Sequence, residues 1–117
     1  MSGANNNNTS AFNLRPLIEK DKLNGHNFLE WEMNVRIVLR AEGKESVLDN
    51  PLPTEPLPEN ATAAQRKARQ TLQDNSLQVT CLMLACMEPN YQKRFNGLDA
   101  YTIIQQLKTM FQKHARL

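Results

Sequence analysis

The sequence predicts an all-α fold: a small helical bundle of three to four helices with a disordered amino-terminal arm. Three observations lead to this prediction. Apolar residues recur at helical spacing in several segments, capping residues precede those segments, and Gly or Pro follows them. The chain has 117 residues, of which 40% are hydrophobic and 22% are charged, which suits one domain with its own core. We therefore expect one helical domain over residues 21–117.

Residues 1–20 are predicted to form a disordered or extended arm. Residues 5–8 are all Asn, and Pro16 interrupts the apolar positions of residues 12–23. The amino terminus lacks the basic region followed by an apolar region that is typical of a signal peptide. The longest apolar run, residues 81–87, is much shorter than the roughly 20 residues of a membrane-spanning helix. We expect a cytoplasmic protein without a membrane partner.

The first long helix is predicted to begin after Asn27 and to end at Gly43. Asn27 with Glu30 three residues later matches a capping box, in which side chains bind backbone N–H groups at the helix start. Gly43 suits the left-handed conformation that commonly follows a helix. Apolar residues at helical spacing mark one face of this helix as core. The predicted core residues here are Phe28, Trp31, Val35 and Val38.

A second apolar row, formed by Leu29, Met33 and Ile37, runs along nearly the opposite face of the same helix. Two interpretations fit this row. Either the helix is sandwiched in the core and covered on both sides, which the pattern alone favours, or the row faces another subunit. The three residues are our candidate self-association site.

Residues 50–60 are predicted to form a proline-rich connector. Four of the eight residues 51–58 are prolines, which favour a stiff, extended chain. Thr62 with Gln65 then matches a second capping box, and the helix that begins there can continue to about Met87.

The second half of this helix is apolar nearly all round, and a helix with apolar residues on every side is normally buried. Leu82 and Met83 are therefore predicted to lie in the core. Cys81 and Cys86 lie five residues apart on the same helix, which is unsuitable for a disulfide, and we interpret them as packing groups.

Two further helices are predicted in the remaining chain. Pro89 suits the first turn of a short helix through Phe95, closed at Gly97, and Asp99 then caps the last helix. That helix has the clearest amphipathic pattern in the sequence. Its predicted core residues are Ile104, Leu107 and Phe111.

No catalytic or metal-binding pattern is present in the sequence. His26 and His114 flank different predicted helices, and no second pair of Cys or His follows at ligand spacing. The four glycines form no phosphate-binding loop. We therefore expect no enzyme activity, no metal, no cofactor and no small-molecule substrate.

The formal net charge is only +2, with 14 basic and 12 acidic side chains, which excludes a strongly basic nucleic-acid binder. Residues 1–60 carry 6 basic and 9 acidic groups, whereas residues 61–117 carry 8 and 3. The asymmetry fits either an uneven surface or pairing between copies. A solvated helix face is the favoured interpretation of the basic residues on the predicted helices. The candidate contacts to RNA phosphates are Arg66, Lys67, Arg69, Lys93 and Arg94.

Several segments resemble the amino-terminal, capsid-like region of plant copia-type LTR-retrotransposon Gag polyproteins. One is Leu-Asn-Gly-His-Asn-Phe-Leu-Glu-Trp at residues 23–31, and another is Cys-Leu-Met-Leu-Ala at residues 81–85. Residues 35–44 and 97–116 are also similar, so the resemblance covers roughly residues 12–117. Leu72 and Asn75 depart from the family pattern, where a larger and an acidic residue are usual.

The resemblance implies a helical structural protein that associates with other Gag subunits into cytoplasmic virus-like particles around element RNA. In that family, RNA binding belongs mainly to a downstream zinc knuckle, which is absent from this sequence. Two alternatives stay open: a Gag-derived protein-interaction adaptor retained by a host, or a weak, non-specific RNA-binding module.

Overall fold

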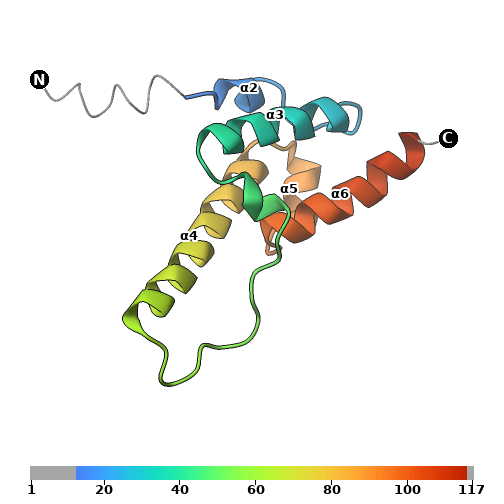
Figure 1. Cartoon of the computed structure of the whole chain (residues 1–117). Helices are drawn as coiled ribbons and strands as arrows, with labels where there is room; N and C mark the ends of the chain where they lie inside the picture. The colour runs from blue at the N-terminus through green and yellow to red at the C-terminus, as the bar shows by residue number, and fades with distance from the viewer. Residues whose placement is uncertain (1–12, 116–117) are drawn as a thin grey trace, which may run out of the picture.

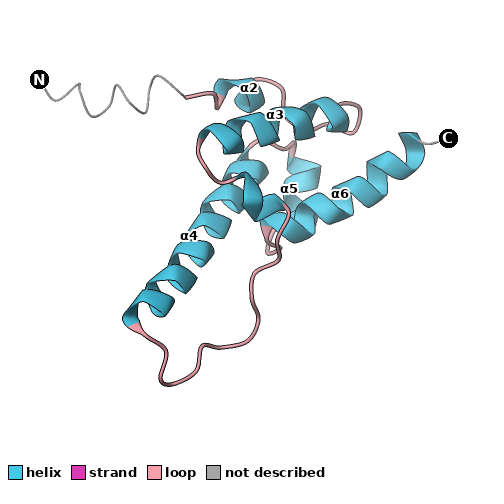
Figure 2. Cartoon of the chain, in the orientation of Figure 1, coloured by secondary structure: helices cyan, strands magenta, loops and turns pink. Residues whose placement is uncertain are grey.

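The computed structural model of the chain describes residues 13–115 and their side chains up to residue 112. The predicted all-α class is confirmed over these residues, where helices and loops make up the fold (Figure 2). Within residues 13–115, five α-helices and one 3-10 helix are present, slightly more than the three to four helices predicted. In order, they are α2 (Pro16–Glu19), α3 (Phe28–Ala41), η1 (Glu45–Leu48), α4 (Ala63–Ala85), α5 (Pro89–Phe95) and α6 (Ala100–Ala115).

The expectation of an arm through residue 20 is wrong in its last part. Residues 16–19 form the short helix α2, with Ile18 buried in the core. Pro16 does not prevent this, because it stands at the first helical position, where a missing N–H and a fixed φ are tolerated. Residues 1–12, the remainder of the predicted arm, lie outside the described residues.

The segment after α2 is tied to the end of α4 by a short backbone bridge. The N–H of Leu23 donates to the carbonyl of Cys86 at 2.9 Å, and the N–H of Glu88 donates to the carbonyl of Leu23 at 3.0 Å. Leu23 and Met87 form the isolated bridge, and both side chains are fully buried. The segment between α2 and α3 is thereby fixed to the segment between α4 and α5.

Helix α3 begins and ends where the sequence predicts, but the capping box predicted at its start is absent. The side chain of Asn27 makes no cap bond; its Oδ1 accepts from the N–H of Asn24 at 3.0 Å, and its Nδ2 donates to the carbonyl of Lys22. Asn27 thus closes the preceding turn. Gly43 has the expected left-handed conformation, with φ of 75°.

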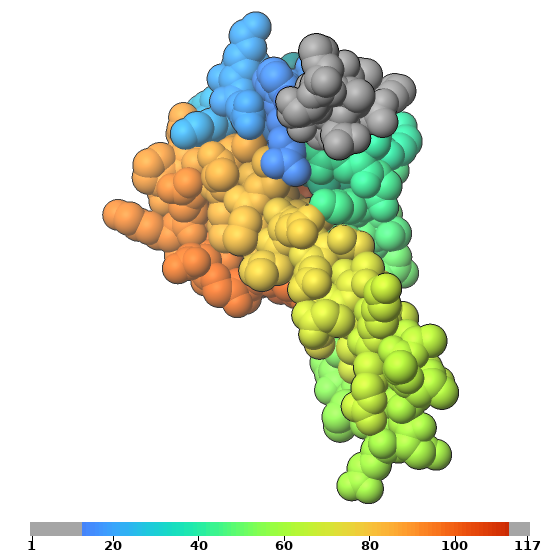
Figure 3. Space-filling view, turned by 90° about the vertical axis from the view of Figure 1, so that its left-hand side faces the viewer, coloured from blue at the N-terminus to red at the C-terminus, as the bar shows by residue number. Residues whose placement is uncertain are grey.

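Helix α4 has the predicted capping box, in which the Thr62 and Gln65 side chains each accept a backbone N–H of the other. Its carboxyl-terminal half packs on the body, whereas residues 63–75 project with the connector (Figures 1 and 3). We call residues 54–71, the outer part of the connector and the first turns of α4, the arm; it is distinct from the amino-terminal arm predicted for residues 1–20. Helix α5 follows α4, and Asp99 caps α6 by accepting the N–H of Thr102 at 2.9 Å.

The predicted burial of the second half of α4 on every side is wrong. Leu77 is 64% exposed and Cys81 is also exposed, while Val79 and Met83 are buried. The physical reason is position: α4 lies at an edge of the body, where η1, α5 and α6 cover only one of its faces.

The predicted core is largely confirmed. Seven of its nine residues are buried, and Leu82 and Phe111 are only partly buried and pack against the core from its margin. The indole Nε1 of Trp31 donates to the backbone carbonyl of Cys86 at 3.0 Å, and the rings of Phe28 and Phe111 stack at 5.4 Å. The buried seven are Phe28, Trp31, Val35, Val38, Met83, Ile104 and Leu107.

Candidate self-association surface

The second apolar row of α3 faces outward. Leu29 is 56% exposed and Met33 is 57% exposed, whereas Ile37 is partly buried. The interpretation that the helix is covered on both sides is therefore wrong at Leu29 and Met33. Large exposed apolar side chains grouped on one face of a helix are typical of an interaction site. We call Leu29, Met33 and Ile37 the α3 outer row.

The turn before α3 holds this row in a fixed position. Gly25 has φ of 90°, and a Cβ atom placed there would lie 2.7 Å from the hydroxyl oxygen of Tyr91 on α5. Only glycine accepts both the left-handed backbone and this close approach. Together with the Trp31 hydrogen bond, the packing fixes α3 against α4 and α5, so its outer row is presented by a rigid element.

A network of ion pairs connects α3 with η1 and α6. Arg36 makes two 3.1 Å hydrogen bonds to Asp49 and also reaches Glu32 at 3.3 Å. Glu45 accepts from Arg40 at 2.9 Å, and Lys108 of α6 lies 3.7 Å from Glu32. A second pair, Arg15 with Glu42, ties α2 to the end of α3 at 2.9 Å.

These pairs shift the proton affinities of their members. The hydrogen bond to Asp49 raises the pKa of Arg36, and the hydrogen bond from Arg15 lowers the pKa of Glu42. The hydrogen bond from Arg40 likewise lowers the pKa of Glu45. Four carboxylates of the acidic front half are thus paired within the chain, which weakens the case for front-to-back pairing of charges between copies.

The structure does not bring the five candidate RNA contacts together. Arg66 and Arg69 donate to the backbone carbonyls of Glu59 and Glu55, at 3.0 and 2.8 Å, and so attach the connector to α4. Lys67 is exposed on the same half-helix. Lys93 and Arg94 lie on α5, beyond the far end of α4, and about 24 Å of helix separates Arg69 from that end.

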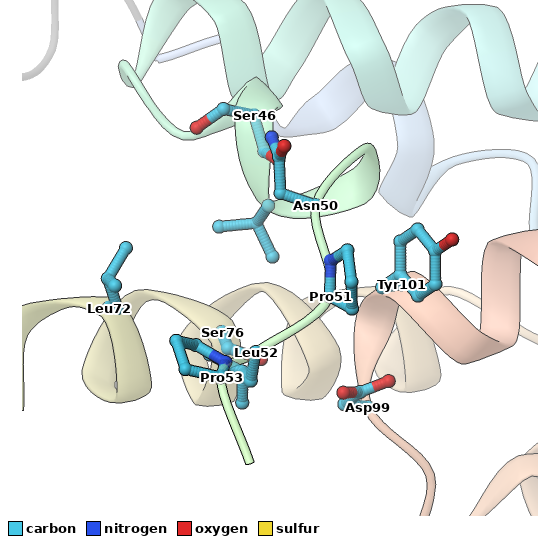
Figure 4. Close-up of a pocket in the computed structure, with 10 residues that line it drawn as sticks. Ser46, Asn50, Pro51, Leu52, Pro53, Leu72, Ser76, Asp99 and Tyr101 are labelled. Carbon is cyan, nitrogen blue, oxygen red and sulfur yellow. The ribbon is translucent and has the colours of Figure 1, made fainter. Parts of the chain in front are cut away.

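Two cavities that sequence reasoning missed lie beside Leu52 of the connector. The smaller, about 200 Å³, is lined by Leu72 of α4 and Tyr101 of α6, and Figure 4 shows the connector passing between these helices. The larger, about 400 Å³, is lined by Leu77 and Thr80 of α4. The Pro-Leu-Pro sequence around Leu52 is the one sequence feature that points to these cavities, because it places a leucine in an extended segment. The sequence alone does not show which part of the chain this leucine contacts.

Among the described residues, neither a metal-ligand cluster nor a membrane-spanning helix is found. No group of three or more His, Cys, Asp or Glu side chains is placed to hold a metal ion within residues that the structure describes. His26 is exposed, and the side chain of His114 lies outside the described part. None of the helices in residues 13–115 is long and apolar enough to cross a bilayer.

Comparison of the chain with protein families, with curated proteins and with solved structures finds no match. The functional argument therefore rests on the resemblance of the sequence motifs and on the geometry of the exposed surfaces.

Proposed function

We propose that the chain is a self-associating structural subunit: the amino-terminal, capsid-like part of a copia-type retrotransposon Gag protein. In this proposal it assembles with other copies in the cytoplasm into virus-like particles around element RNA. The observation that carries the proposal is the α3 outer row, in which Leu29 and Met33 expose more than half of their side chains on a rigidly held helix. Burying such residues against another copy is favourable because it removes apolar surface from water.

Four motif residues on which the resemblance rests also support the proposal, because they hold α3 in the position that exposes this row. Asn24 and Asn27 close the turn before α3, and Gly25 permits the contact with Tyr91. Trp31 anchors the buried face of the helix on the end of α4. A motif that maintains the position of α3 is consistent with a function performed by the outer face of that helix.

The test is sedimentation velocity over a range of concentrations. We expect the wild-type chain to associate and the Leu29→Glu/Met33→Glu double variant to associate at least about tenfold more weakly, because the charges resist burial. Circular dichroism should be unchanged, since both positions are exposed. Leu17→Glu, an exposed leucine on α2, is the matched control and should associate normally. A wild-type chain that stays monomeric at high concentration would contradict the proposal. The host-retained protein-interaction adaptor would then be the remaining candidate.

RNA binding by this chain itself is the weaker candidate. Arg66 and Arg69 already bind the connector, and Lys93 and Arg94 lie beyond the far end of α4, away from Lys67. Retention of RNA on filters that disappears steeply between low and moderate salt would favour this candidate, since it would indicate several phosphate contacts.

A further inference from the structure

The two cavities beside Leu52 form one groove along α4. Leu52, Ser76 and Asp99 line both cavities, so the two cavities meet at the Leu52 side chain. Figure 4 shows Leu52 at the wall of the smaller cavity. The space on either side of this side chain is unfilled. We call these two cavities together the α4 groove. Its larger cavity has an apolar wall that includes Leu77 and Leu84.

Thr80 on the wall of the larger cavity is a buried group without a partner. It is 8% exposed, and its hydroxyl oxygen makes no hydrogen bond among the residues that the structure describes. A buried hydroxyl without a partner is unfavourable, and native proteins normally satisfy such groups. The oxygen itself has almost no accessible surface, however, so a ligand in the open cavity does not reach it, and Thr80 contributes only its apolar atoms to the wall. The apolar wall of the cavity favours an aliphatic side chain, which an extended peptide can supply.

The chain itself shows which peptide this groove accepts. The connector contains the same three residues twice, Pro-Leu-Pro at 51–53 and again at 56–58. The first unit inserts Leu52 into the groove. The second unit lies outside it, on the arm that projects from the body (Figure 3).

The second unit is held in place on the arm by hydrogen bonds on both sides of it. Arg69 donates to the carbonyl of Glu55, immediately before the unit, and Arg66 donates to the carbonyl of Glu59, immediately after it. The prolines themselves favour an extended backbone. A segment that is already ordered loses less conformational entropy when it binds, so the arm presents the unit in a form suited to docking.

The charges of the arm and of the groove are complementary. Asp99 is the only charged residue among those that line the two cavities, and no Lys or Arg lines either one. The half-helix beside the second unit carries Arg66, Lys67 and Arg69. Approach of the arm to the groove therefore brings a basic segment toward a carboxylate.

We propose that the α4 groove binds the second Pro-Leu-Pro unit, residues 56–58, of another copy of the chain. Leu57 enters the larger cavity beside Leu77, where the apolar wall buries its side chain. Because arm and groove both lie on α4, antiparallel pairing of two α4 helices brings each arm to the other groove and closes as a dimer. This inference rests on the proposed self-association and adds a contact separate from the α3 outer row.

The direct test uses the ¹⁵N-labelled full chain and a synthetic peptide of residues 54–70, followed by NMR. We expect saturable shifts of the backbone amides of Thr80, Leu84 and Leu98, which line the larger cavity. A peptide with Leu57→Ser is the matched control and should cause at least about tenfold weaker binding, since it removes the aliphatic side chain. Absence of shifts, or shifts confined to α3, would overturn the inference.

Sedimentation of two sets of variants separates this inference from the proposed function. Leu77→Glu should remove the α4 contact while keeping association through the α3 outer row, and the fold should persist because Leu77 is exposed. The Leu29→Glu/Met33→Glu variant should still form dimers through the arms. If Leu77→Glu leaves association unchanged and the α3 variant is monomeric, the arm contact is wrong and the proposed function stands. If the wild-type chain is monomeric, both fail.

Discussion

The indole Nε1 of Trp31 donates a 3.0 Å hydrogen bond to the backbone carbonyl of Cys86, the residue that caps the carboxyl end of α4. The same carbonyl also accepts the N–H of Leu23. One helix-terminal oxygen therefore joins the segment before α3, the buried face of α3 and the end of α4. This junction fixes the position from which α3 presents its outer row.

Replacing Trp31 with Phe should destabilise the fold by about 2 kcal/mol, because it removes a buried hydrogen bond and leaves part of the indole volume empty. The free energy of unfolding in urea measures this change. Tyr101→Phe, which removes one hydroxyl group from a partly buried ring, is the control and should cost much less. Equal stability of Trp31→Phe and wild type would show that the junction contributes nothing.

Gly25→Ala should cost about 1–3 kcal/mol of stability, from left-handed strain and from the clash with the Tyr91 hydroxyl. Gly43→Ala is a matched control, since Gly43 also has positive φ but has no atom within 4 Å of the added Cβ. Thermal unfolding should therefore show a smaller loss for Gly43→Ala. Adding Tyr91→Phe should recover part of the loss in Gly25→Ala and none in Gly43→Ala; no recovery would exclude the clash.

The Arg15–Glu42 pair should contribute stability that depends on pH. The pKa of Glu42 is lowered by its hydrogen bond with Arg15, so the folded chain favours the carboxylate. The contribution is complete above the usual value of about 4.5 and is lost as pH falls through the lower pKa of the folded state. Because Arg15 is partly exposed, we expect only about 0.5–1 kcal/mol.

Arg15→Met measures the contribution of this pair. Its unfolding free energy should lie below that of wild type at pH 7, and the two curves should converge as the pH falls through the lowered pKa of Glu42 in the folded state. A difference that stays constant over this range would mean that Arg15 acts through packing and not through its charge.

The two thiols should react at very different rates with a reagent such as DTNB. Cys81 is exposed, whereas Cys86 is buried, and burial raises the pKa of the Cys86 thiol. One thiol should react within seconds to minutes, and the second only as fast as the core opens. Cys81→Ser should remove the fast phase alone. A fast phase that survives in Cys81→Ser would contradict the burial of Cys86.

The sequence predicts those features that depend on neighbours along the chain. The Thr62 cap, Asp99 at the start of α6 and the left-handed Gly43 were all predicted correctly, since each involves residues within one or two turns. The buried face of α3 was also predicted, because its period of 3.6 residues is complete in the sequence.

Features that depend on distant parts of the chain were not predicted. Periodicity marks Leu77 as apolar, but it cannot show that α4 lies at an edge of the body, where this residue is exposed. The Asn27 side chain had two sets of partners within reach, and it binds Asn24 and Lys22 in place of the helix start. The candidate site follows the same division: the α3 outer row was found, whereas the α4 groove requires the connector to meet α4 and α6.

The bridge between Leu23 and Met87 joins positions more than half the chain apart. Contacts over such separations slow folding, because a long loop must close before any energy is gained. During synthesis, α3 leaves the ribosome well before the residues that cover its apolar face have been made. The core can close only after the end of α4 has emerged, so the newly made amino-terminal half depends on a late step for protection from aggregation.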